Sequence, residues 1–324
     1  MVGSRLIRVV QGLFLAGMLM LAPTARAETV TIGLVGKGVA TQWPLYIGLK
    51  KGFYDAADLK LDMVTTPSSQ VVLQQLAAGS LDMALSAGLV DPIHAIDKCA
   101  PIAIVRLEMQ APPYAILSKP TFKSLSELKG KLIMVDSPKG ITRIYVERML
   151  APNGVKPGEF DMVFAGATGA RLAALQSGAV DATILLPPFS FFAESAGFHN
   201  LGLTVDYAKE LPFTGAVVNR NWAAAHRATL DKLLAVHNKS MAWFLDPKNR
   251  DEAIAIMGQY SKMKPELIGK TYDFLHKNAF FDATGVVSKT KMKALIDALK
   301  QLGDLQGSGD ITRYVLAGVT KLGD

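Results

Sequence analysis

One pattern occurs twice in the chain: LAAGSLDMAL at residues 76–85 and LQSGAVDATI at residues 175–184. In each copy an apolar helical stretch stops at a glycine, Gly79 or Gly178, and a short apolar strand begins after an aspartate. Glycine is common just past a helix C-terminus because it adopts the left-handed backbone conformation without steric cost. A helix–glycine–strand unit in each half of the chain predicts two similarly wound α/β lobes with a cleft between them.

The first 27 residues have the features of a secretory signal peptide. Arg5 and Arg8 flank the start of an apolar run, Val9–Ala22, and Ala25-Arg26-Ala27 fits the small-x-small cleavage pattern. The run is shorter than the roughly 20 residues that cross a bilayer as a helix. We therefore expect cleavage after Ala27 and a periplasmic mature protein, with an uncleaved N-terminal anchor as the alternative.

Composition argues against several classes of function. The formal net charge is +7, but three of the arginines lie in the expected signal peptide, and the rest of the chain contains no basic block. Nucleic acid is therefore not an expected partner. Cys99 is the only cysteine, which excludes an internal disulfide and predicts a buried structural thiol. The five histidines are scattered and no catalytic or phosphate-binding motif is present, so we expect no catalytic residue, metal or cofactor.

Strand-like apolar runs alternate with helical stretches up to Val218, which predicts wound, mostly parallel sheets with flanking helices. A mature length of about 300 residues corresponds to two domains of about 150 residues each. The strand Tyr114–Leu117, followed by polar Ser118-Lys119-Pro120, predicts a crossing between lobes, and a return strand follows at Thr214–Val218. We expect a signal peptide at 1–27, a discontinuous first lobe at 28–117 and 216–324, and a second lobe at 118–215. The helices after Asn221 are expected to pack on the first lobe and to shape no site.

In an open α/β sheet, ligands bind beyond the carboxyl ends of the strands, where helix N-termini present free N–H groups. This rule selects loops rich in Ser, Thr, Gly and Gln, with aromatic residues beside them: Gly36–Gln42, Pro67–Gln70, Ser86–Leu89, Asp136–Thr142, Ala165–Gly169 and Leu186–Phe189. Hydroxyls that cap helices and aromatics that belong to the core would give the same pattern, so both interpretations stay open. The candidate ligand-binding residues are Gln42, Trp43, Ser68, Ser69, Ser86, Ser137, Gly140, Thr142, Pro188 and Phe189. Trp43 is expected at the mouth of the cleft.

Several stretches, in order, resemble a known family: Trp43–Gly48 running into Lys51–Tyr54, Leu76–Asp82, Ser124–Lys131, and Ala174–Ala182 with the following Pro187-Pro188. The family is that of the periplasmic substrate-binding proteins of ABC importers in the nitrate, aliphatic-sulfonate and taurine group, which includes binders of thiamine-pyrimidine precursors. The resemblance implies a two-lobe clamshell with two hinge strands. It also implies a monomer that is not an enzyme and delivers one small molecule to a permease in the cytoplasmic membrane.

The resemblance leaves the ligand open between anionic and aromatic compounds. Members of the family usually have small hydroxyl residues after a glycine at a helix start in the second lobe, where this chain has Gly140-Ile141-Thr142. The lost hydroxyl at Ile141 favours a bulkier, more apolar compound over a sulfonate or nitrate. Two alternatives to import remain: a module that reports to a sensor or chemoreceptor, and an enzyme similar to thiamine-pyrimidine synthases. The leader and the lone Cys99 argue against the enzyme.

Overall fold

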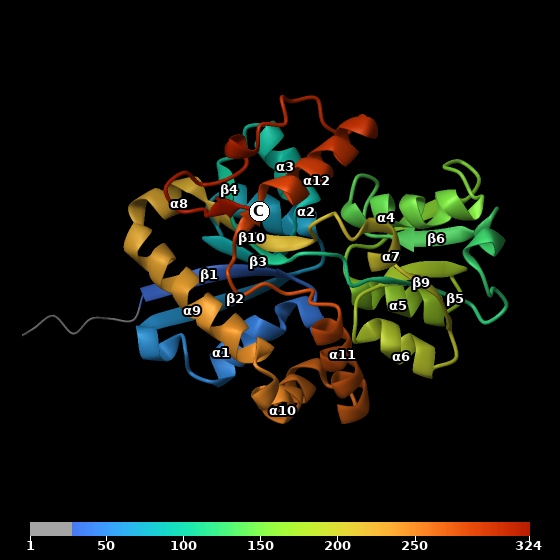
Figure 1. The fold of residues 1–324 in the computed structure, drawn as a ribbon, viewed down its shortest axis with the longest axis horizontal. Coiled ribbons are helices and arrows are strands. Elements are labelled where there is room, and N and C mark those ends of the chain that lie inside the picture. The colour runs from blue at the N-terminus through green and yellow to red at the C-terminus, as the bar shows by residue number, and fades with distance from the viewer. Residues whose placement is uncertain (1–27) are drawn as a thin grey trace, which may run out of the picture.

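Two five-stranded sheets, each with helices on both faces, form the two lobes of the molecule (Figure 1). The computed structural model describes residues 28–324, so the expected signal peptide lies outside the described residues. The first sheet has the order β2-β1-β3-β10-β4, with β1 (Glu28–Val35), β2 (Leu59–Thr66), β3 (Met83–Gly88), β4 (Ile102–Met109) and β10 (Thr214–Asn219). The second has the order β7-β6-β8-β5-β9, with β5 (Ala115–Ser118), β6 (Leu132–Val135), β7 (Asp161–Phe164), β8 (Ala182–Leu185) and β9 (His199–Leu203).

The two sheets are built alike. Strands β1, β2 and β3 run parallel, as do β6, β7 and β8. The fourth position of each sheet holds one antiparallel strand, β10 in the first and β5 in the second. This arrangement confirms the predicted α/β fold of two wound, mostly parallel sheets.

The repeated sequence pattern has the same structural role in both lobes. Gly79 and Gly178 end their helices with φ values of +79° and +76°. The aspartate of each copy then ties its strand to the neighbouring parallel strand. Asp82 Oδ2 accepts from the Thr31 N–H at 2.8 Å, and Asp181 Oδ2 accepts from the Leu132 N–H at 3.1 Å. The predicted helix–glycine–strand unit is therefore confirmed in each lobe.

Helices cover both faces of each sheet (Figure 1). In the first lobe they are α1 (Trp43–Lys50), α2 (Ser69–Ala77), α3 (Val90–Asp97), α8 (Arg220–Ala225), α9 (Arg227–Leu245) and α12 (Lys289–Gln301). In the second lobe they are α4 (Ile141–Leu150), α5 (Thr168–Gln176), α6 (Phe189–Ser195) and α7 (Val205–Ala208). Two further helices, α10 (Arg250–Ser261) and α11 (Pro265–Lys277), follow α9, and the short pair β11 (Val287–Ser288) and β12 (Leu322–Gly323) lies near the C-terminus.

The chain crosses between lobes earlier than expected. The strand predicted at Tyr114–Leu117 is β5, which pairs with β8 and β9 of the second sheet, so the crossing precedes Ala115 and the expected crossing at Ser118-Lys119-Pro120 is wrong. The return strand β10 lies in the first sheet, as predicted. The two connections are hydrogen-bonded to each other, because the Tyr114 N–H donates to Thr204 Oγ1 at 3.0 Å.

The C-terminal helices contact both lobes, which corrects the expectation that they pack on the first lobe alone. The α11 residue Phe274 meets Phe191 of α6 edge to face, with ring centroids 5.4 Å apart. Lys270 Nζ lies 2.6 Å from the Glu194 carboxylate, also on α6. On the other side of the molecule Asp304 pairs with Lys139 at 3.1 Å and with Arg143 of α4 at 3.3 Å.

The lone cysteine lies at the surface. Cys99 is exposed, with φ +64° just after α3, so the expected burial is wrong, because the turn that ends α3 directs this residue to solvent. Within residues 28–324, no helix is both long and apolar enough to cross a membrane. The same part of the chain contains no cluster of three His, Cys, Asp or Glu side chains that could hold a metal ion.

Candidate functional site

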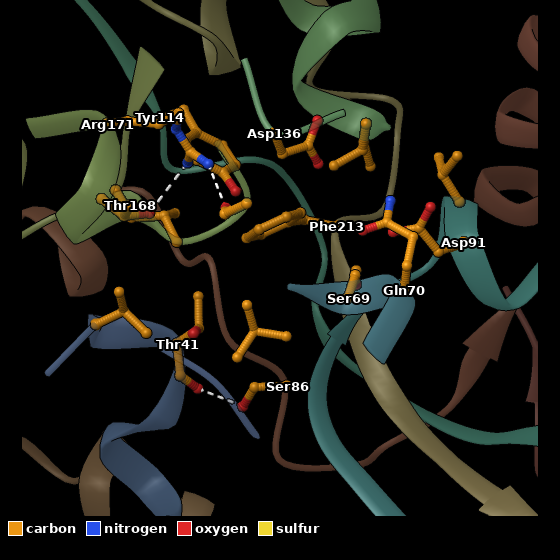
Figure 2. Close-up of a pocket in the computed structure, with 17 residues that line it drawn as sticks. Thr41, Ser69, Gln70, Ser86, Asp91, Tyr114, Asp136, Thr168, Arg171 and Phe213 are labelled. Carbon is orange, nitrogen blue, oxygen red and sulfur yellow. Dashed lines mark hydrogen bonds between the residues drawn. The ribbon is translucent and has the colours of Figure 1, made fainter. Parts of the chain in front are cut away.

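A cleft lies between the two sheets at the carboxyl ends of their parallel strands (Figure 2). It contains about 650 Å³ of space free of protein atoms, including its opening to solvent. The first lobe contributes the polar residues Thr41, Ser69, Gln70, Ser86 and Asp91, and the second contributes Asp136, Thr168 and Arg171. Most of these residues lie in the loops selected by the carboxyl-end rule.

Apolar and aromatic side chains form the rest of the wall. Tyr114 and Phe213 come from the two connections between the lobes, and their rings lie 5.0 Å apart between centroids in an edge-to-face contact. Val90 and Ile141 line the cleft from α3 and α4. A ligand in this cleft therefore meets an aromatic base formed where the lobes join, with polar groups on both sides.

Ser86 at the end of β3 is held in an unusual backbone conformation. Its φ is +56°, which is uncommon for a residue with a side chain. The Ser86 N–H donates to Glu108 Oε2 at 2.8 Å, and its hydroxyl donates to the Thr41 carbonyl at 2.7 Å. Because that hydroxyl proton is engaged, the Ser86 side chain faces a ligand mainly as an acceptor.

Beneath Ser86 lies a row of contacting, buried polar side chains, which the sequence did not lead us to expect. Glu108 Oε1 lies 3.0 Å from His237 Nε2, and His237 Nδ1 lies 3.0 Å from the Tyr54 hydroxyl. Burial lowers the pKa of His237. Burial acts to raise the pKa of Glu108, but the His237 hydrogen bond and the charge of Arg106 outweigh it and lower that pKa. The ionised Glu108 therefore holds the Ser86 backbone from below.

Asp136, directly after β6, places a carboxylate at the start of α4. Its Oδ1 accepts from the Ser137 N–H at 2.7 Å and from the Thr142 hydroxyl at 2.6 Å. The carboxyl group lies against Gly140, where a Cβ would come within 2.2 Å of Oδ1, so glycine is required there. Burial nevertheless raises the pKa of Asp136, against the lowering effects of Arg171 and of these hydrogen bonds.

Asp91 occupies the first turn of α3 in the opposite lobe and lines the same cleft (Figure 2). Burial, together with the negative charge of Asp136, raises the pKa of Asp91 to about 7, while the Ser69 hydroxyl acts in the opposite direction. The two carboxylates therefore interact across the cleft although they belong to different lobes. A carboxylate beside another carboxylate in a buried site is costly to ionise unless a positive group joins them.

Arg171 is the cationic side chain of the cleft lining, and four of its five N–H donors bind acceptors of its own lobe. Its Nε donates to the Ile184 carbonyl at 2.9 Å, and its Nη2 donates to Thr168 Oγ1 at 3.1 Å. Its Nη1 donates to the carbonyls of Ala165 and Gly166. With a side chain that is 1% exposed, Arg171 fixes the loop after β7 to the end of β8.

The structure brings only part of the candidate set to the cleft. Ser69 and Ser86 line it. Ser68 caps α2 by accepting from the Val71 N–H, and Thr142 is fully buried against Asp136. The remaining candidates also lie outside the lining: Gln42, Trp43, Ser137, Gly140, Pro188 and Phe189. Direct contact between any of the ten and a ligand stays a prediction.

Trp43 does not lie at the mouth of the cleft, and that expectation is wrong. Its side chain is 0% exposed and meets Phe244 of α9 edge to face at 6.3 Å. Trp43 is the first residue of α1, and one face of this helix packs on α9. The indole therefore points into the protein interior. The neighbouring Gln42 is also buried, with its Nε2 donating to the Val35 carbonyl at 3.0 Å.

The fold matches solved structures of binding proteins over nearly the whole chain. The alkanesulfonate-binding protein SsuA from Xanthomonas axonopodis pv. citri bound to MOPS has a TM-score of 0.73 at 18% identity, over 91% of this chain and 98% of that one. The periplasmic nitrate-binding protein NrtA from Synechocystis PCC 6803 has a TM-score of 0.71 at 16% identity, over 87% and 83%. The desulfurization enzyme DszB has a TM-score of 0.68 at 13% identity, over 90% and 97%.

At these identities the matches establish the periplasmic-binding-protein fold, which also occurs in an enzyme. No curated protein matches the chain by sequence. The model of the NMT1/THI5-like family matches residues 40–250, which is more than half of the chain and includes residues from both sheets. The chain therefore belongs to the NMT1/THI5-like family.

Proposed function

We propose that this protein is the extracytoplasmic solute-binding component of an ABC importer, acting as a monomer that captures one small organic molecule and delivers it to a membrane permease. The observation that carries the proposal is the cleft itself, whose polar groups come from the strand ends of both lobes. A ligand held by both lobes stabilises the closed arrangement, because it binds that arrangement better than the open one. The solved neighbours that are named as binding proteins for alkanesulfonate and nitrate support this role.

The proposed role is binding rather than catalysis. The fold does not decide the matter, since DszB shares it. The support comes from the polar groups of the cleft, which are fixed by their own lobe: Asp136 by Thr142, Arg171 by backbone carbonyls, and Ser86 by Glu108. Such fixed groups suit the recognition of a ligand of defined shape.

Identification of the bound compound tests the function. The protein is purified from the periplasm without denaturation, and the small molecule released on unfolding is identified by mass spectrometry. We expect one unaltered molecule per chain and, in cells that lack the gene, loss of its uptake at low external concentration. Conversion of the compound by the protein would indicate an enzyme. Unchanged uptake with a lost chemotactic or signalling response would indicate a sensor module.

Export is part of the same proposal. The leader pattern predicts that the mature chain begins at Glu28, which is the first residue of β1 in the structure. Mass spectrometry of the periplasmic protein should give Glu28 as the N-terminal residue. A chain that retains Met1 and sediments with membranes would contradict export with cleavage.

A further inference from the structure

A carboxylate of the protein itself lies beside the start of α4, a position that would otherwise suit an anionic ligand. A helix N-terminus attracts anions through its free N–H groups and its dipole. Here the Asp136 carboxylate lies against Gly140, the N-cap of α4, and takes the Ser137 N–H and the Thr142 hydroxyl as donors. An anionic group of a ligand would meet a negative charge at this position.

The other lobe also places a carboxylate at a helix start. Asp91 is the second residue of α3 and lines the same cleft as Asp136. Figure 2 shows Asp91 beside Gln70 and Ser69 on one side of the cleft and Asp136 on the other. Each lobe therefore presents a carboxylate to the ligand beside a helix start.

The single positive charge of the cleft lining, on Arg171, does not outweigh the negative charges of the two carboxylates. Arg171 gives four hydrogen bonds to acceptors of its own lobe, namely the carbonyls of Ala165, Gly166 and Ile184 and the Thr168 hydroxyl. Burial raises the pKa of the Tyr114 hydroxyl, while the charge of the Arg171 guanidinium and a hydrogen bond with it act in the opposite direction. Four of the five N–H donors of Arg171 thus hold the loop after β7, and its single positive charge stands against the two carboxylates of the cleft.

We propose that the ligand carries a protonated nitrogen, such as an ammonium or amidinium group, that lies between Asp91 and Asp136 and joins the two lobes. This inference rests on the proposed binding function and narrows it to cationic compounds. The body of the ligand then lies on Tyr114 and Phe213, whose rings form the base of the cleft. Aromatic faces attract cations as well as planar apolar groups.

A cation also gives the carboxylates a part in closure. In the absence of a ligand, closing the lobes brings two acidic groups into one buried site, which is unfavourable for the ionised pair. A cation with N–H donors for both carboxylates removes that repulsion and adds charge-assisted hydrogen bonds. The same arrangement discriminates against sulfonates and nitrate, which would add negative charge beside the two carboxylates.

Three compounds of one shape test the charge of the ligand directly. Benzamidine, benzamide and benzoate share a planar frame and carry charges of +1, 0 and −1 at neutral pH. Their affinities for the purified protein are measured by calorimetry and thermal shift at pH 8, with nitrate as a fourth probe. We expect benzamidine to bind at least about tenfold more tightly than benzoate, and nitrate to give no stabilisation.

Variants assign the effect to the two carboxylates. Asp91→Asn and Asp136→Asn should each weaken benzamidine binding by about tenfold or more and leave benzamide within about threefold, as loss of one charged hydrogen-bond partner predicts. Asp62→Asn, which alters an exposed carboxylate on β2, serves as the matched control. Should Asp136→Asn fail to fold, Asp91→Asn and the wild-type charge series still decide the question.

The inference is overturned if benzoate or nitrate binds the wild type at least as tightly as benzamidine, or if benzamidine does not bind. It is equally overturned if both variants retain full benzamidine affinity. Binding of benzoate would leave the proposed transport function intact, because an importer of anions would behave in this way. Failure of the function itself would appear separately, as uptake that does not depend on the gene.

Discussion

Asp91 makes the stability of the protein depend on pH. Its pKa, raised to about 7, lies well above the ordinary value of about 3.9. Between these values the folded protein keeps a proton that the unfolded chain releases, so the free energy of unfolding falls as pH rises from about 4 to about 7. The other ionisable groups that line the same cleft are Asp136, Tyr114 and Arg171. All three are present both in the wild type and in the variant of Asp91 described next.

Asp91→Asn should remove this part of the pH dependence. We expect the variant to be more stable than the wild type by about 1–3 kcal/mol at pH 8 and to match it near pH 4. Urea denaturation across this pH range measures the difference, with Asp62→Asn as the exposed control. Parallel curves for the wild type and the variant would show that Asp91 ionises normally.

Trp43 provides a second test at the level of one side chain. Since it is fully buried against Phe244, Trp43→Ala should cost about 3–5 kcal/mol of stability through the lost contacts and the cavity left behind. Trp222, which is only partly buried and stacks on His226, is the matched control and should cost clearly less on truncation to Ala. A Trp43→Ala protein with unchanged melting but weakened ligand binding would return Trp43 to the binding site.

At this scale the sequence predicted the loops of the site better than its side chains. The carboxyl-end rule selected the loops that contain Ser69, Ser86 and Asp136, because it depends on strand direction alone. The expected position of Trp43 at the mouth of the cleft was wrong because the packing of α1 on α9 is not encoded in the loop pattern. Arg171 was missed because its neighbours in the sequence predict only an amphipathic helix, whereas its acceptors come from other strands and loops.

Among the elements, α11 connects the first lobe to α6 of the second. Lys270 lies over the Phe191 ring at 4.3 Å and pairs with Glu194. Exposed pairs of this kind contribute about 0–1 kcal/mol to stability, yet this one forms only when the lobes are together. Lys270→Glu places two negative charges in contact and should shift the population toward the open arrangement.

The shift of the population toward the open arrangement can be measured by energy transfer between two dyes. One dye is attached to the exposed Cys99 of the first lobe, and the other to a Lys156→Cys substitution in the second lobe. We expect lower transfer efficiency for Lys270→Glu at low salt and a smaller difference near 1 M salt, where charges are screened. Lys293→Glu is the matched control, since Lys293 pairs with Asp297 inside α12 and bridges no lobes. Equal transfer in both variants would mean that the α11–α6 contact does not hold the lobes together.

The elements themselves were largely predictable, whereas their pairing was not. The repeated pattern identified α2–β3 and α5–β8 because glycine and aspartate mark the same turn in both copies. Strand β5 was placed in the wrong sheet because its residues Ala115–Leu117 are all apolar and would suit either sheet. The contact of α11 with the second lobe was missed for the same reason, since an amphipathic pattern shows that a face is buried without showing against what.

At the scale of the whole molecule, two short connections at residues 110–114 and 204–213 join lobes of equal topology. The connections are hydrogen-bonded to each other and to the ends of the sheets, as in the bond from the Phe213 N–H to the Met109 carbonyl at 3.0 Å. Each lobe has its own sheet and helices, so a change in their relative position requires few internal rearrangements. Rotation about these connections is the motion that the architecture favours.

This motion gives the last prediction. The contacts between lobes on both sides, through Glu194 and Asp304, describe a closed arrangement. If a ligand stabilises it, small-angle scattering should give a smaller radius of gyration with the compound recovered from the periplasmic protein than without it. Lys270→Glu should start from a larger value and need more compound for the same decrease. An unchanged scattering curve at saturation would contradict closure while leaving binding in the cleft possible, because a rigid cleft would bind without moving.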